Sequence, residues 1–159
     1  MVFATAVRLL GDPADAEDAA QTVFLKAFER FDDLRESEAA GGWLKTTTRN
    51  ACLNHLSRYR SRRRLFSEID DGGAADLAYA DSIESSGAAA DDLLARADAA
   101  EALEAAVRAL PDHQRVPLVL FHFEDASYEE IARALGVSLG KIKTDIHRGR
   151  EALRRMLTP

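Results

Sequence analysis

Residues 127–150 constrain the fold more than any other part of this chain. Ser127 and Glu130 have the spacing of a capping box, which predicts that a helix begins directly after Ser127. Gly136 is expected to end that helix, because glycine adopts the left-handed conformation that a tight turn between helices requires. Ser138 can then cap a second helix. Two capped helices joined by a glycine turn predict a helix-turn-helix.

The predicted second helix has an apolar side and a basic side. Its apolar residues recur at spacings of four, seven and four, so we expect one side to be buried. A helix can enter the major groove of DNA, where cations contact phosphates and base edges. The alternative, a hairpin with a merely solvated charged face, is disfavoured because caps, spacing and basicity agree. The apolar side holds Ile142, Ile146, Leu153 and Leu157, and the basic side Lys141, Lys143, Thr144, His147, Arg148, Arg154 and Arg155.

Charge is segregated along the chain, although the formal net charge is −6. Residues 45–64 contain seven lysines and arginines and no acid, whereas residues 65–106 are strongly acidic. Four of the arginines fall within residues 60–64, where they would repel one another on a free helix and are best explained by contact with phosphate. Two basic segments on either side of an acidic one suggest two contacts with a polyanion.

Catalytic and metal-binding patterns are not found in the sequence. Its single cysteine, Cys52, excludes an internal disulfide framework, and no apolar run approaches the length of about 20 residues that spans a bilayer. We therefore expect a cytoplasmic protein without catalytic residues, metal or cofactor. No phosphate loop or nucleophile motif occurs. The four histidines lack metal-ligand spacing; they are His55, His113, His122 and His147.

The N-terminal part predicts two helices separated by Gly11. Asp12 supplies an N-cap and Pro13 a first helical residue for the second helix, which should extend to Phe31. An apolar stripe along this helix, including Phe24, Phe28 and Phe31, is expected to pack in the core. Its polar face is either solvated or a docking surface, and composition does not decide between them.

A polar loop over residues 32–42 should precede a third helix that begins near Trp43 and continues through the basic segment. Tyr59 lies among the cations of this segment, a setting that suits stacking on unpaired bases. We expect Trp43 to be a core residue rather than a stacking platform. The inner side of this helix is predicted to hold Trp43, Leu44, Thr47, Ala51, Leu53 or Asn54, and Leu56.

The chain is predicted to be all-α, with two small helical domains over residues 1–66 and 91–159. Residues 67–90 are rich in Asp, Ala, Gly and Ser and predict a flexible linker. Its acidity either maintains solubility or imitates a nucleic-acid strand. The second domain should open with a helix that stops at Pro111, followed by a helix capped by Asp112 in which Pro117 causes a kink or a late start.

Residues 9–31, 43–56 and 109–157 together resemble bacterial sigma factors of the extracytoplasmic-function (ECF) type, within the sigma-70 family. The resemblance implies a sigma-2-like and a sigma-4-like domain that bind core RNA polymerase and direct it to promoters. It also implies an anti-sigma factor as a partner. The acidic linker resembles the segment that threads the polymerase's RNA-exit channel, which favours strand imitation. By the same resemblance, the N-terminal helix that follows Asp12 docks on the clamp coiled coil of the largest subunit. The docking residues would be Asp18, Gln21, Thr22, Leu25 and Lys26.

The resemblance further implies two DNA contacts. The first domain would capture a melted strand of the minus-ten element, holding a flipped base. The helix-turn-helix would read the minus-thirty-five element as duplex. The minus-ten candidates are Trp43, Arg49, Asn50, Asn54, Arg58, Tyr59, Arg62 and Arg63. The minus-thirty-five candidates are Ser138, Lys141, Lys143, Thr144, His147 and Arg148.

Four features depart from the family pattern. A further N-terminal helix is usual in the family, and residues 35–42 lack the aromatic and basic residues often found there. Asp145 stands where a cation is common and is expected either to accept from a cytosine amino group or to cost a phosphate contact. Gly149 replaces the usual alanine, at about 1 kcal/mol in helix propensity. A stand-alone DNA-binding regulator, or a polymerase- or anti-sigma-binding protein without initiation activity, are the alternatives.

Overall fold

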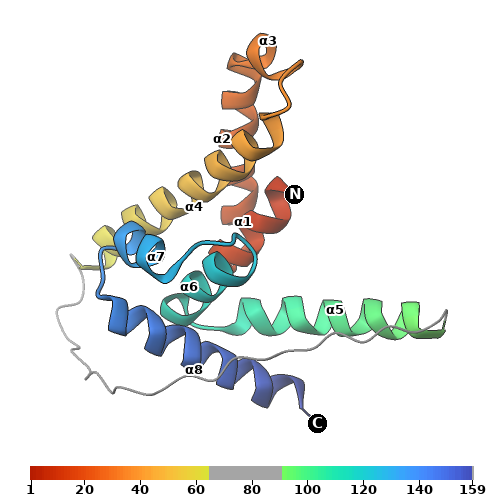
Figure 1. Cartoon of the computed structure of the whole chain (residues 1–159), viewed down its shortest axis with the longest axis vertical. Coiled ribbons are helices and arrows are strands. Elements are labelled where there is room, and N and C mark those ends of the chain that lie inside the picture. Colours follow the sequence, from red (N-terminus) through yellow and green to blue (C-terminus); the bar gives the residue numbers. More distant parts are fainter. Residues whose placement is uncertain (65–90, 159) are drawn as a thin grey trace. The chain divides into compact units, whose positions relative to one another are not determined.

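The computed structural model describes the backbone of residues 1–64 and 91–158, and the side chains of residues 1–58 and 97–158. Within these ranges every regular element is a helix (Figure 1). The chain divides into two compact units, Met1–Gly72 and Gly73–Pro159, here called the N-terminal and C-terminal units. The predicted linker, residues 67–90, lies outside the described residues. The all-α prediction is confirmed.

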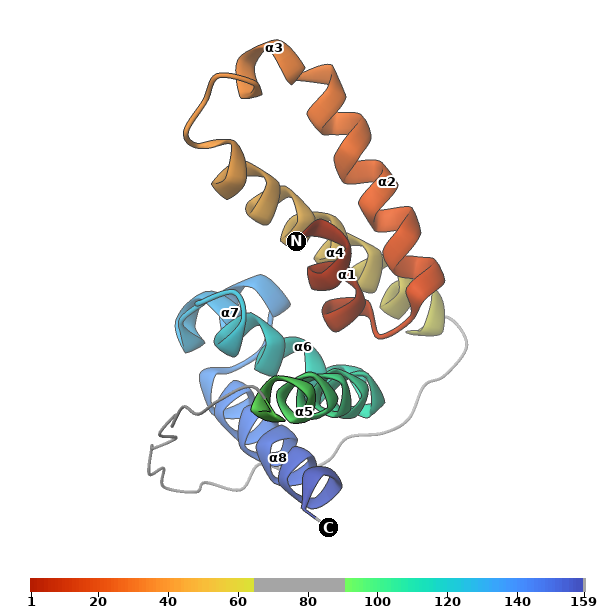
Figure 2. The same cartoon turned by 90° about the vertical axis from the view of Figure 1, so that its right-hand side faces the viewer.

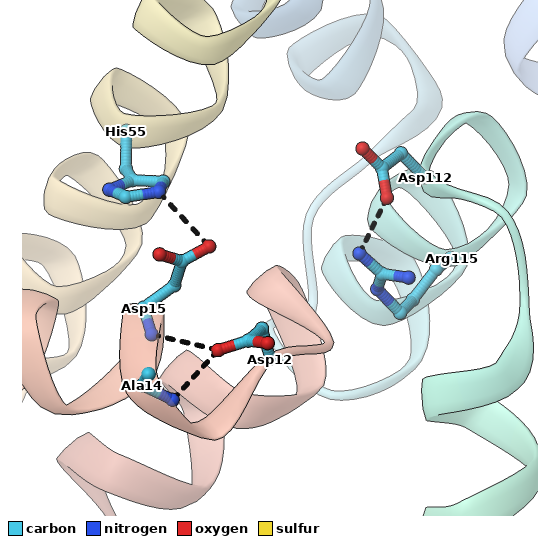
Figure 3. Close-up of polar contacts among 6 residues, drawn as sticks. All are labelled: Asp12, Ala14, Asp15, His55, Asp112 and Arg115. Carbon is cyan, nitrogen blue, oxygen red and sulfur yellow. Dashed lines mark hydrogen bonds and ion pairs between the residues drawn. The ribbon is translucent and has the colours of Figure 1, made fainter.

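The N-terminal unit is built from three packed helices and one short helix. Helices α1 (Val2–Leu10), α2 (Pro13–Glu29) and α4 (Ala40–Arg64) contact one another in pairs, and α3 (Phe31–Leu34) follows α2 (Figure 1). Gly11 ends α1 with φ 75°. Asp12 caps α2 as predicted, its Oδ1 atom accepting from the backbone N–H groups of Ala14 at 2.8 Å and Asp15 at 3.1 Å (Figure 3).

Small side chains allow α2 to pack closely in this unit. Val2 of α1 is buried with Ala20 and Val23 of α2, and α4 contributes partly buried Leu44 and Ala51. On α4 the fully buried residues are Thr48 and Cys52, so the predicted inner face omitted two core residues. The Thr48 hydroxyl donates to the Leu44 carbonyl at 2.7 Å, which satisfies a polar group in the core.

The phenylalanine stripe of α2 and α3 is exposed, so the prediction that it packs in the core is wrong. Relative exposure is 56% for Phe24, 79% for Phe28 and 57% for Phe31. The reason is helix length: α1 has 9 residues and α2 has 17. Because the start of α1 already lies against Val23, the later turns of α2 extend past it (Figure 2).

The connection between α2 and α4 is shorter and more ordered than predicted. Helix α2 ends at Glu29 instead of continuing to Phe31, and the short α3 occupies part of the expected loop. Helix α4 begins at Ala40, so Trp43 already lies within its first turn. Trp43 is half-buried.

In the C-terminal unit, α8 (Leu139–Leu157) packs against α5 (Asp91–Ala109), α6 (Asp112–His122) and α7 (Tyr128–Leu135) (Figure 1). Pro117 lies inside α6, which starts at Asp112, so a late start is excluded. The predicted cap is displaced by one residue, because Pro111 is the N-cap. The fully buried large residues of this unit include Val107, Val116, Leu118, Val119, Leu120, Ile131, Ile142 and Ile146.

The helix-turn-helix forms as predicted. The Ser127 hydroxyl accepts from the Glu130 N–H at 3.2 Å, and a Glu130 carboxylate oxygen accepts from the Ser127 N–H at 2.8 Å. Gly136 adopts φ 66° at the turn, and the Ser138 hydroxyl accepts from the Lys141 N–H at 3.2 Å. The buried side of α8 is shorter than expected, because Leu153 is half-buried and Leu157 is exposed.

Candidate functional sites

The outer side of α8 presents two strips of candidate DNA-contacting residues. Lys141, Thr144 and Arg148 follow one another at spacings of three and four, which places them on one strip. Lys143 and His147 form a second strip across the exposed surface. The lysines and Arg148 are exposed, whereas Thr144 and His147 are half-buried. Ser138 is exposed at the N-cap, so the fold brings all six candidates to the two outer strips and the N-terminus of one helix.

Asp145 does not belong to this outer surface, which corrects the expectation that it could accept from a cytosine amino group. Its relative exposure is 4%, and its Oδ2 atom lies 2.9 Å from the Nζ atom of Lys141. The pair is spaced i,i+4 on α8, the distance at which side chains of one helix meet. Asp145 therefore acts on the neighbouring lysine.

A cluster of aromatic and basic side chains braces α8 against the rest of its unit. Arg150 Nε donates to His122 Nε2 at 3.0 Å, and the Arg150 guanidinium carbon lies 5.5 Å from the centroid of the Phe121 ring. The Phe121 ring stacks on Tyr128 with centroids 4.6 Å apart. Burial lowers the pKa of Arg150 from its ordinary value because it disfavours the charged form. These contacts join α6, α7 and α8. They fix the orientation of α8, the second helix of the helix-turn-helix, here called the recognition helix.

Gly149 lies where α8 closely approaches Gln114 and Leu118 of α6. A Cβ atom at this position would lie 2.9 Å from a terminal methyl of Leu118. Leu118 is buried, so it has little room to move. The glycine is therefore explained by the close approach of the two helices.

On α4 of the N-terminal unit, four of the five minus-ten candidates with described side chains share one face. Trp43, Asn50, Asn54 and Arg58 recur at spacings of seven, four and four, and the last three are exposed. Arg49 is half-buried and falls on a different side of the helix. The backbone of α4 continues through Tyr59, Arg62 and Arg63, whose side chains lie outside the described residues.

A pocket of about 300 Å³ opens between the end of α2 and the start of α4. It lies beside Trp43, at the start of the α4 face that also carries Asn50, Asn54 and Arg58. Its volume is at the lower limit of ordinary ligand pockets. Glu29, Arg30 and Thr47 were not among the predicted site residues. Lys26, Glu29 and Arg30 nevertheless have the i,i+3 and i,i+4 spacing that places side chains on one side of a helix. The lining residues are Lys26, Glu29, Arg30, Trp43, Thr47 and Asn50.

The candidate polymerase-binding residues lie on the outer side of α2. All are exposed. Asp18, Gln21 and Leu25 lie opposite the side that buries Ala16, Ala20 and Val23, whereas Lys26 lies nearer to α4 and lines the pocket. The Thr22 hydroxyl donates to the Asp18 carbonyl at 3.0 Å, so it is directed along the helix. This face is polar apart from Leu25, which is 66% exposed. Its members are Asp18, Gln21, Thr22, Leu25 and Lys26.

Among the described residues, no group of three His, Cys, Asp or Glu side chains could hold a metal ion. None of the helices in the described part of the chain has both the length and the apolar character of a membrane span.

Comparison with known proteins assigns the two units. The model of "Sigma-70 region 2" matches residues 1–63, and that of "Sigma-70, region 4" matches residues 100–153. The RNA polymerase sigma-H factor of Pseudomonas aeruginosa is 32% identical over 157 residues, covering 96% of this chain and 78% of that protein. The chain belongs to the sigma-70 family of RNA polymerase sigma factors. The predicted family is confirmed, and its region 2 match includes α1 to α4.

A second relative shows that this sigma factor is of the ECF type. The ECF RNA polymerase sigma factor EcfG of Rhodopseudomonas palustris is 32% identical over 154 residues, covering 97% of this chain and 77% of the relative. A solved structure of the sigma factor RpoE in complex with the anti-sigma factor NepR from Bartonella quintana is 25% identical with a TM-score of 0.49. That comparison covers 98% of this chain and 89% of the solved one.

Proposed function

We propose that this sigma factor binds core RNA polymerase and directs promoter-specific initiation through two DNA contacts made by separate domains. The observation that supports this most is the pairing of a region 2 match and a region 4 match, each on a unit that presents a polar face. The proposed domain limits are residues 1–66 and 91–159, with residues 67–90 as the linker. The protein would act in the cytoplasm, where polymerase and chromosome meet.

The first domain is proposed to hold melted minus-ten DNA on α4. The pocket beside Trp43 offers an aromatic wall, the carboxylate of Glu29 and the amide of Asn50, a combination able to stack on a base and hydrogen-bond its edge. Lys26 and Arg30 at the rim can neutralise phosphates. The strand would continue along Asn54 and Arg58 toward Tyr59, Arg62 and Arg63. Arg49, on a different side of α4, would not lie on this path.

The second domain is proposed to read minus-thirty-five duplex DNA with α8. The strip of Lys141, Thr144 and Arg148 would contact base edges. The second strip, Lys143 and His147, would contact the wall of the groove. The exposed Ser138 and the first turn of α8 offer backbone N–H groups to a phosphate. The brace around Arg150 keeps these donors at a fixed angle to the rest of the unit.

The outer face of α2 is the proposed polymerase contact, docking on the clamp coiled coil of the largest subunit. It is polar, exposed and opposite the core, as a docking face requires. An anti-sigma factor is the proposed regulatory partner, since a solved sigma factor of similar sequence forms such a complex.

Run-off transcription with purified core polymerase tests this proposal. The full chain should support transcription from templates selected from a promoter library, and core enzyme alone should not. A variant with Gln21→Ala and Leu25→Ala should fail to co-elute with core enzyme on a sizing column while remaining folded. Tight binding to duplex sites without polymerase, with no transcription, would favour the alternative of a stand-alone regulator.

A further inference from the structure

The recognition helix contains a buried acid that is directed at one of its own outer cations. The Asp145 side chain is 5% exposed and the Lys141 side chain is 50% exposed, so the pair joins the protein interior to the outer surface. Their atoms lie 2.9 Å apart. Asp145 is one position from the buried Ile146, and Lys141 stands on the strip with Thr144 and Arg148.

The burial of Asp145 determines what Lys141 can do. A carboxylate removed from water requires a charged or hydrogen-bonding partner, and the lysine ammonium provides one. A lysine on an exposed helix normally samples many rotamers, because its stem is flexible. The ion pair with Asp145 restricts that freedom and holds the Lys141 ammonium group near Thr144 and Arg148.

The same pair changes the kind of contact that Lys141 can make with DNA. The nearby carboxylate offsets its charge, which weakens its attraction to phosphate. An ammonium has three N–H donors, so those not used by Asp145 remain available in a fixed direction. Directed donors suit base-edge acceptors in the major groove, and the O6 and N7 atoms of guanine are the usual acceptors for lysine.

We propose that Asp145 is a positioning residue for sequence reading, which holds Lys141 as a donor to a guanine edge and keeps it from the phosphates. This inference rests on the proposed function, because it assigns a role within the minus-thirty-five contact. It explains why an acid stands inside a basic recognition helix. Asp145 itself does not touch the DNA.

Selection from a promoter library tests the role of Asp145. Holoenzyme reconstituted from core polymerase and the full chain is used to select duplexes randomised upstream of a fixed minus-ten element. The wild-type chain should select a guanine at one position of the upstream motif. Asp145→Asn removes the charge with little change of shape and should reduce that preference by about tenfold, the effect of one base contact. Binding should also become more salt-dependent, with the slope of log K against log [salt] steeper by about 0.9, because Lys141 gains a phosphate.

A double-mutant cycle separates positioning from a merely structural role. Lys141→Gln should lose the same preference, and adding Asp145→Asn to it should cause no further loss. Lys143→Gln is the matched control: it removes an exposed charge on the same helix away from Asp145, and its effect should add to that of Asp145→Asn. If Asp145→Asn weakens all sites equally, or leaves the guanine preference unchanged while wild type selects it, the inference is overturned. If wild-type holoenzyme selects no upstream sequence, the proposed function itself fails.

Discussion

The Nε2 atom of His55 on α4 lies 3.3 Å from the Oδ2 atom of Asp15 on the first turn of α2 (Figure 3). The contact ties the start of α2 to the helix that presents Asn54, the neighbour of His55. It therefore steadies the proposed single-strand surface from behind.

Replacing Asp15 should loosen the N-terminal unit by a modest amount. The His55 side chain is 33% exposed and the Asp15 side chain 44%, so water screens the pair. Asp15→Asn should therefore lower the free energy of unfolding by about 0.5 kcal/mol. Trp43 is the only tryptophan, so its fluorescence during urea unfolding reports this unit alone. Glu17→Gln removes an exposed acid from the same end of α2 and serves as the control. Equal losses for the two variants would show that the His55 contact contributes nothing.

The two glycines of α8 should respond in opposite ways to substitution by larger residues. Gly140 has open space around its Cβ position, so Gly140→Ala should stabilise the unit by up to about 1 kcal/mol through helix propensity. At Gly149 the same gain is opposed by contact with Leu118, and Gly149→Val should destabilise by about 2 kcal/mol through overpacking. Urea unfolding followed by circular dichroism measures both. A stable Gly149→Val variant would contradict the close approach of α8 and α6.

The capping box should account for much of the local stability of the helix-turn-helix. Ser127→Ala removes the hydroxyl that accepts from the Glu130 N–H and should cost about 1 kcal/mol. Glu130→Gln retains an oxygen that can accept from the Ser127 N–H, so it should be nearly neutral. Hydrogen exchange of the α7 amides measures the difference. Equal protection in Ser127→Ala and wild type would disprove the contribution of the cap.

Local hydrogen bonding explains which parts of the fold were predictable from sequence. The capping box of Ser127, the turn at Gly136 and the cap at Asp12 depend on atoms within three or four residues, and all three formed as expected. The apolar period of α8 was likewise sufficient to locate Ile142 and Ile146 in the core. The outer face of the recognition helix follows from that period alone.

Features that depend on distant segments were not predictable in this way. The exposure of Phe28 follows from where α1 ends along α2, which residue spacing does not encode. Thr48 is buried because α4 packs against α1 and α2, and its local hydrogen bond to the Leu44 carbonyl only makes that burial possible. Its polarity therefore suggested the wrong side of α4. The pocket lined by Glu29 and Trp43 needs the end of one helix to meet the start of another. The burial of Asp145 excludes the predicted contact with a cytosine amino group, and it depends on how α8 packs in its unit.

The exposed stripe on α2 gives a direct test of the packing. Phe28→Ala should change the free energy of unfolding by no more than about 0.5 kcal/mol, because the ring is 79% exposed. Val23→Ala, one turn earlier and fully buried, should cost about 1 to 3 kcal/mol. The comparison uses Trp43 fluorescence in both variants. A Phe28→Ala loss as large as that of Val23→Ala would mean that the ring is covered in solution.

Arg115 should be among the most sensitive positions of the C-terminal unit. Its guanidinium donates to Asp112 Oδ1 at 2.7 Å (Figure 3). It also donates to the Leu110 carbonyl at 2.7 Å and so joins the end of α5 to the start of α6. Arg115→Ala should destabilise by about 3 kcal/mol, because two charge-assisted hydrogen bonds are lost at a buried site.

Two further variants separate the contributions of those hydrogen bonds. Arg115→Lys keeps the charge but lacks the planar fork that reaches both acceptors, so it should recover less than half of the loss. Asp112→Asn leaves the bond to Leu110 in place and should cost only about 1 kcal/mol, since Asp112 is partly exposed. Urea unfolding by circular dichroism gives the three values. If Asp112→Asn proved as harmful as Arg115→Ala, the bond to the Leu110 carbonyl could not be what holds α5 and α6 together.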